Sequence, residues 1–77
     1  MNKEQKYYQI IQMLKPLLKN ESNLIANLAN SAAILYNNLD DVNWAGFYLR
    51  EDDELVLGPF QGKNACVRIE KGSGVCG

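Results

Sequence analysis

The sequence predicts an α+β fold in which two N-terminal helices pack on an antiparallel sheet. Through the first half of the chain, apolar residues recur at three- and four-residue spacings, which is typical of amphipathic helices. From about residue 42 onward, short apolar runs are separated by turn residues, which is typical of strands. The order helix, helix, strand, strand, strand therefore indicates an α+β fold, and 77 residues make at most one small domain.

The first helix is expected in the segment 1–19. Its apolar stripe consists of Tyr7, Ile10, Ile11, Leu14, Leu17 and Leu18. Pro16 lies within this stripe. Because proline has no amide hydrogen and disfavours the helical conformation at Lys15, we expect a kink or a break there.

The second helix is expected in the segment 20–39. Asn20 and Ser22 are residues of the type that caps helix N-termini, and we expect them to open it. Polar residues at 37–38 and 40–41 are expected to end it. Its apolar stripe consists of Leu24, Ile25, Leu28, Ala32, Leu35 and Leu39.

The segment 42–77 is expected to form strands and loops. A hairpin is predicted from residues 42–49 and 54–57, with a polar turn between them. Gly58-Pro59 is expected to stop the second strand, because proline cannot donate to a sheet ladder. A short strand at 66–69 and a glycine-rich turn at 72–74 follow. Such a sheet has an open edge and a partly uncovered face, so we expect it to be incomplete in this chain.

Composition and charge exclude several classes of function. Eight basic and nine acidic residues give a net charge of -1, without the basic excess of a nucleic-acid binder. The chain has neither an apolar run of the ~18 residues that a membrane helix needs nor a signal-peptide pattern at its start, so the cytoplasm is the expected compartment. Histidine is absent and only two cysteines are present, so imidazole catalysis and a zinc site built by this chain alone are excluded. No metal and no cofactor is predicted.

The first predicted strand carries an aromatic pair around a glycine. Alternation places Trp44, Gly46 and Tyr48 on one face, with two aromatic walls and a bare floor between them. Such a cup suits a small ligand with an apolar or cationic end. Alternatively, both aromatic side chains pack under the helices as ordinary core residues.

The two cysteines, Cys66 and Cys76, also allow two interpretations. Free cysteine is commonly a small buried hydrophobe, and both thiols can be spectators. In a cytoplasmic protein, however, two cysteines without histidine also suit redox chemistry, and the nearby Arg68 and Lys71 are placed to stabilise a thiolate.

Four segments together resemble one family. These segments are Asn43–Leu49 (NWAGFYL), Leu55–Gly62 (LVLGPFQG), Ala65–Ile69 (ACVRI) and Gly72–Gly77 (GSGVCG). In order and spacing they resemble the free methionine-(R)-sulfoxide reductases, which are single GAF domains of roughly twice this length. The resemblance begins at about Asn20, and it implies that residues 1–77 are the N-terminal part of one GAF-like domain.

The resemblance implies a specific activity. Members of the family reduce free L-methionine (R)-S-oxide to methionine and are recycled by thioredoxin. Cys66 and Cys76 match the first and second of three family cysteines, which serve as resolving or relay thiols. Trp44 and Tyr48 match aromatic positions of the substrate pocket, and the family's frequent dimers make a homodimer possible.

The sequence also departs from the family. The third cysteine, the attacking nucleophile of the family, and its substrate-binding carboxylates belong to the half that this chain lacks. Asn64 and Glu70 stand where many members have proline. The chain alone is therefore expected to be inactive. Two alternatives remain: a non-catalytic GAF-type ligand-binding or regulatory module, and a non-functional fragment that cannot complete its sheet.

Overall fold

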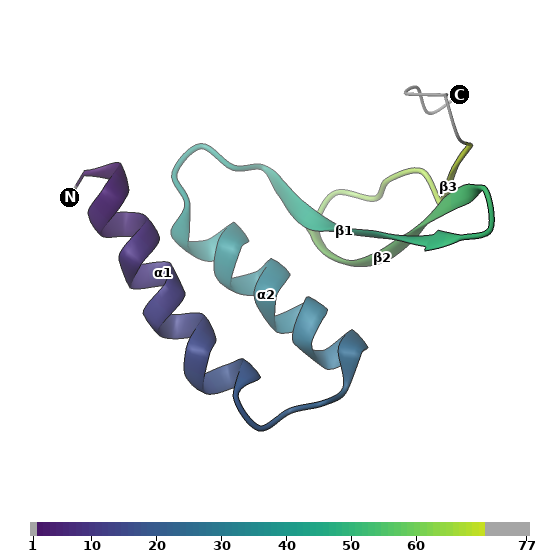
Figure 1. Cartoon of the computed structure of the whole chain (residues 1–77). Helices are drawn as coiled ribbons and strands as arrows, with labels where there is room; N and C mark the ends of the chain where they lie inside the picture. Colours follow the sequence, from purple (N-terminus) through teal and green to yellow (C-terminus); the bar gives the residue numbers. More distant parts are fainter. Residues whose placement is uncertain (1, 71–77) are drawn as a thin grey trace.

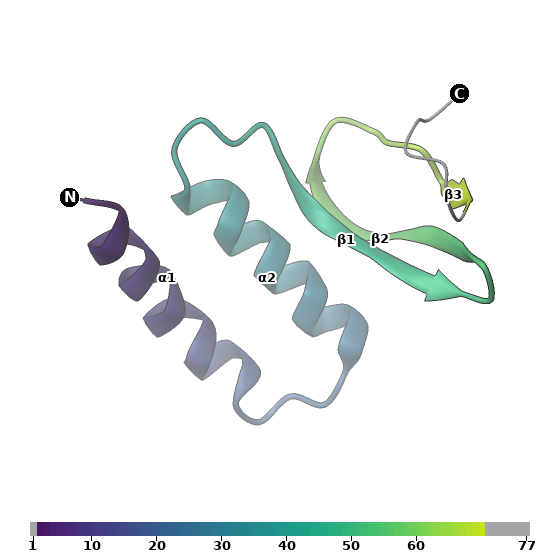
Figure 2. The same ribbon diagram turned by 45° about the horizontal axis from the view of Figure 1, so that its top comes forward.

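Residues 2–70 are described by the structure, a computed structural model. They form the helices α1 (Lys3–Leu18) and α2 (Leu24–Asn38) and the strands β1 (Trp44–Glu51), β2 (Glu54–Gly62) and β3 (Arg68–Glu70). The strands form one antiparallel sheet in the order β1-β2-β3. Both views show α2 between α1 and the sheet (Figures 1 and 2). The predicted α+β class is confirmed.

Helix α1 begins with a capping box. The Asn2 side chain accepts a hydrogen bond from the Gln5 amide at 2.8 Å, and the Gln5 side chain accepts one from the Asn2 amide at 3.1 Å. Of the kink or break expected at Pro16, the break is wrong, because the helix continues to Leu18 and the Lys19 amide still bonds to the Lys15 carbonyl. Pro16 lies in the last turn, where its missing donor removes one bond from a helix that is already ending.

Helix α2 begins later than expected. Its N-cap is Asn23, whose side chain accepts from the Ala26 amide at 2.8 Å, so the assignment of Asn20 and Ser22 as caps is wrong. The Glu21 carboxylate accepts from the Asn23 amide at 3.0 Å and so supports this cap. The helix ends at Asn38, in the polar segment that was expected to end it.

Strand β2 does not stop at Gly58-Pro59. It continues to Gly62, because the register shifts between the pairs Gly46–Phe60 and Tyr48–Leu57. One residue of β1 thereby faces two residues of β2, which is a β-bulge. A bulge tolerates proline because the extra residue needs no ladder hydrogen bond. The other strands are displaced too: β1 begins two residues after the predicted start and β3 covers 68–70 instead of 66–69.

The core of the described residues is small. Ile10 of α1 and Ala32 and Ile34 of α2 are buried, and α2 contacts both β1 and β2. The predicted stripe of α2 is only partly correct, because Leu24 and Ile25 at its start are exposed. None of the helices in the described part of the chain is long and apolar enough to cross a membrane.

The turn between β1 and β2 generates a test of backbone strain. Asp52 has a φ of 54° at the first position of this two-residue connection, where glycine is preferred. Asp52→Gly should raise the free energy of unfolding by about 0.5–1 kcal/mol, because glycine carries no Cβ penalty there. Urea unfolding measures the change.

Asp53→Gly is the matched control for this turn. It removes the same charge from the neighbouring position, whose φ is not positive, and so relieves no strain. An Asp52→Gly variant no more stable than Asp53→Gly would show that the backbone at Asp52 is not strained.

Candidate functional site

Three aromatic side chains form a stacked cluster on the sheet, here called the aromatic cluster. Trp44 and Tyr48 of β1 have ring centroids 6.3 Å apart, and Trp44 and Phe60 of β2 have centroids 5.5 Å apart. The ring planes differ by 27° and 17°, so the indole is stacked with each of its two neighbours. All three side chains are half-buried. Trp44 and Tyr48 thus share a face as predicted.

The predicted bare floor at Gly46 is wrong. A Cβ on Gly46 would lie 2.4 Å from the Cβ of Phe60 and 2.8 Å from the Cη2 atom of Trp44. Gly46 therefore permits a close aromatic approach and leaves no open space. Sequence reasoning missed Phe60 because it ended the second strand at Leu57. Extending that strand through a bulge at Gly58-Pro59 would have placed Phe60 opposite Gly46.

The polar atoms of the Trp44 and Tyr48 side chains form hydrogen bonds with the β2–β3 connection, residues 63–67. The indole Nε1 of Trp44 donates to the Lys63 carbonyl at 3.1 Å, and the hydroxyl of Tyr48 donates to the Cys66 carbonyl at 2.8 Å. The Leu57 amide donates to the Val67 carbonyl, also at 2.8 Å. This connection is thus bonded to β1 at its Lys63 end and to both β1 and β2 at its Cys66–Val67 end.

The connection places one predicted thiol residue beside the aromatic cluster. Cys66 is half-buried and disulfide-bonded, and the described residues contain no free cysteine. Cys76 and Lys71 lie outside the described residues, as does the glycine-rich turn at 72–74. Arg68 lies 3.5 Å from the Glu54 carboxylate, in an exposed ion pair across β2 and β3. Its charge therefore has a partner other than the predicted thiolate.

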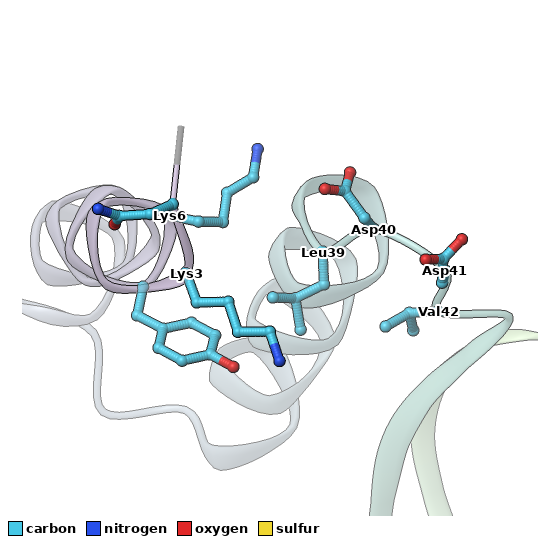
Figure 3. A pocket seen from close by; sticks show the side chains of 8 residues that line it. Lys3, Lys6, Leu39, Asp40, Asp41 and Val42 are labelled. Carbon is cyan, nitrogen blue, oxygen red and sulfur yellow. The ribbon is translucent and has the colours of Figure 1, made fainter.

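Two hollows lie on the surface of the described residues, one beside Trp44 and one beside the start of α1. One, of about 590 Å³, is bordered by the indole of Trp44 together with Tyr36, Asn43, Gln61, Gly62, Lys63 and Asn64. The other, of about 460 Å³, separates the start of α1 from the connection between α2 and β1. Figure 3 shows Lys3 and Lys6 on one side of it and Asp40 and Asp41 on the other. Within residues 2–70, no three histidine, cysteine or acidic side chains gather as metal ligands would.

Known proteins resemble this chain along its whole length. The free methionine-R-sulfoxide reductase of Escherichia coli is 57% identical over 77 residues, which are 100% of this chain and 47% of that protein. The X-ray structure of free methionine-R-sulfoxide reductase from Neisseria meningitidis in complex with its substrate is 42% identical. It superposes with a TM-score of 0.89 over 99% of this chain and 46% of that one. A solved GAF domain is 40% identical. It superposes with a TM-score of 0.85 over 99% of this chain and 47% of the GAF-domain chain.

The chain spans about half the length of the curated relatives it matches. No family model matches it. The structural similarity confirms the GAF-like fold predicted for the helices and the sheet.

The aromatic cluster generates a test of packing. Gly46→Ala should lower the free energy of unfolding by about 1–3 kcal/mol, because the new methyl group must displace Phe60 or the indole. Gly58→Ala is the matched control in the same sheet, since its nearest neighbours lie at 3.1 and 3.3 Å and the loss should be smaller. Equal stability of the two variants in urea would contradict the close approach at Gly46.

Proposed function

We propose that this chain, a homologue of the free methionine-R-sulfoxide reductases along all of its 77 residues, acts in thiol-dependent reduction of free L-methionine (R)-S-oxide to methionine. In this proposal it supplies the aromatic wall of the substrate site and two of the thiols. The observation that carries the proposal is the hydrogen bond from the Tyr48 hydroxyl to the Cys66 carbonyl. This bond shows that the aromatic cluster lies beside a cysteine residue, so a surface suited to a methyl sulfoxide and a thiol-bearing residue are neighbours.

The aromatic cluster suits the apolar end of the substrate. A methyl sulfoxide presents a methyl group and a polarizable sulfur, and both make favourable contacts with aromatic rings. The half-buried indole of Trp44 also borders the 590 Å³ hollow, so one of its surfaces faces open space. We assign Trp44 and Tyr48 to substrate binding and add Phe60 as the residue that supports the indole.

The thiols supply the electrons. A thiolate attacks the sulfoxide sulfur, the oxygen passes to the cysteine as a sulfenic acid, and methionine leaves. A second thiol then attacks the sulfenic sulfur, which forms a disulfide and releases water. Reduced thioredoxin returns two electrons and two protons to that disulfide. We assign Cys66 and Cys76 to the resolving or relay steps and the first attack to a third cysteine outside these 77 residues.

Two further properties belong to the same proposal. A thioredoxin-linked reductase of a free amino acid is expected in the cytoplasm, where thioredoxin keeps thiols reduced. A homodimer is supported by the apolar groove of about 470 Å³ along α1, which Ile11, Leu14 and Leu18 line together with Lys15 and Lys19.

A non-catalytic GAF-type module is the second candidate. Its support is the similarity to a solved GAF domain together with the open hollow beside Trp44. Such a module would bind a small molecule without any need for the two cysteines, so dependence on the thiols separates the two functions.

Binding can be followed directly, because Trp44 is the chain's single tryptophan. Free L-methionine (R)-S-oxide should change its fluorescence in a saturable way, whereas the (S)-epimer should not. Phe60→Leu should weaken the binding by roughly two- to tenfold, because it removes the stacking partner of the indole. Tyr8→Phe, at a 66% exposed residue of α1, is the control and should bind like the unmodified chain. An equal response to both epimers would contradict a substrate site at Trp44.

Turnover gives an independent test of the thiol assignment. With dithiothreitol as reductant, the 77-residue chain should reduce no free methionine-(R)-sulfoxide, because the attacking cysteine belongs to the longer relatives in this proposal. Turnover that Cys66→Ser or Cys76→Ser abolishes would instead show that one of these thiols is the nucleophile.

A further inference from the structure

The hydroxyl of Tyr48 is already used within the protein. It donates to the Cys66 carbonyl at 2.8 Å, and the two residues lie 18 positions apart in the sequence. A phenol has a single proton to donate, so in this arrangement the hydroxyl cannot also donate to a ligand. The ring of Tyr48 is left to contact a substrate, while its polar atom acts on the backbone of a cysteine.

Tyr48 and Leu57, which pair across β1 and β2, donate hydrogen bonds to two successive backbone carbonyls of the β2–β3 connection. Tyr48 in β1 lies opposite Leu57 in β2. The Tyr48 hydroxyl bonds to the carbonyl of Cys66, and the Leu57 amide bonds to the carbonyl of Val67 at 2.8 Å. The two peptide groups that follow the Cys66 Cα are therefore fixed to the same point of the sheet.

The other end of the connection is held by the neighbouring aromatic side chain. The indole Nε1 of Trp44 bonds to the Lys63 carbonyl at 3.1 Å, and the rings of Trp44 and Tyr48 are stacked on each other. A displacement of one ring therefore affects both attachments of residues 63–67. The same two side chains that line the proposed substrate site thus hold the connection in which Cys66 lies, and Tyr48 alone bonds to Cys66 itself.

We propose that Tyr48 is a positioning residue for Cys66: its hydroxyl fixes the Cys66 backbone and thereby sets how readily the Cys66 sulfur bonds to a second thiol. Trp44 assists by holding the Lys63 end of the same connection. This inference deepens the proposed function, on which its biological meaning rests, but it concerns thiol pairing alone and can be tested without any sulfoxide.

The test is the thiol–disulfide equilibrium of the 77-residue chain in glutathione buffers. In these buffers the two protein thiols and oxidised glutathione exchange with the protein disulfide and two reduced glutathione molecules, so electrons and protons balance. Alkylation followed by mass spectrometry measures the oxidised fraction. Tyr48→Phe should lower the equilibrium constant for disulfide formation by roughly two- to tenfold, the range that one net hydrogen bond supplies. Tyr8→Phe removes an exposed phenol hydroxyl from α1 and should leave the constant unchanged.

This equilibrium separates positioning from general stabilisation. A merely structural hydroxyl would stabilise the oxidised and reduced forms equally, so its removal would lower the urea midpoint of both and leave the constant where it was. A constant for Tyr48→Phe equal to that of Tyr8→Phe overturns the proposal. If the far-UV circular dichroism shows that Tyr48→Phe is unfolded, the Trp44→Phe variant is measured instead. Its equilibrium constant for disulfide formation should also fall, by a smaller factor than expected for Tyr48→Phe. An unchanged constant overturns the proposal. Failure of free L-methionine (R)-S-oxide to bind at Trp44 would refute the proposed function without changing this result.

Discussion

The site depends on one constraint, the absence of a side chain at Gly46. This absence lets β2 and the indole of Trp44 approach β1 closely. With no Cβ at this position, Phe60 sits directly opposite in β2 and the indole of Trp44 lies across the strand. The indole then stacks with both Phe60 and Tyr48. That arrangement directs the indole N–H and the phenol O–H to the connection 63–67. A side chain at position 46 would therefore disturb the packing, the aromatic cluster and the position of Cys66 together.

The bulge in β2 is the backbone counterpart of this contact. It adds one residue between the partner of Tyr48 and the partner of Gly46, and so brings Phe60 rather than Pro59 opposite the glycine. A proline in a regular central strand would leave a ladder bond unmade, whereas at the bulge it leaves the pairing on both sides intact. The feature that looked like a strand end in the sequence is thus the feature that aligns the aromatic residues.

The helices contribute less burial than their patterns suggest. Of the described residues, only Ile10, Ala32 and Ile34 are buried, while Leu24 and Ile25 are 60% and 55% exposed. α2 is the middle layer and packs on α1 and on the sheet (Figure 1). With so few buried apolar side chains, each one carries a large share of the stability of these residues. The site therefore rests more on the aromatic contacts and hydrogen bonds of the sheet than on a deep core.

The sequence by itself determined the kinds of elements, their order and the face that Trp44 and Tyr48 share, because these follow from periodicity over a few neighbouring residues. It also indicated the family, through segments whose order and spacing need no coordinates. Only the tertiary structure decided that Phe60 lies opposite Gly46 and that the Tyr48 hydroxyl reaches Cys66, 18 residues further along the chain. Both depend on strand register, which a single bulge shifts by one residue, and local pattern carries no information about such a shift.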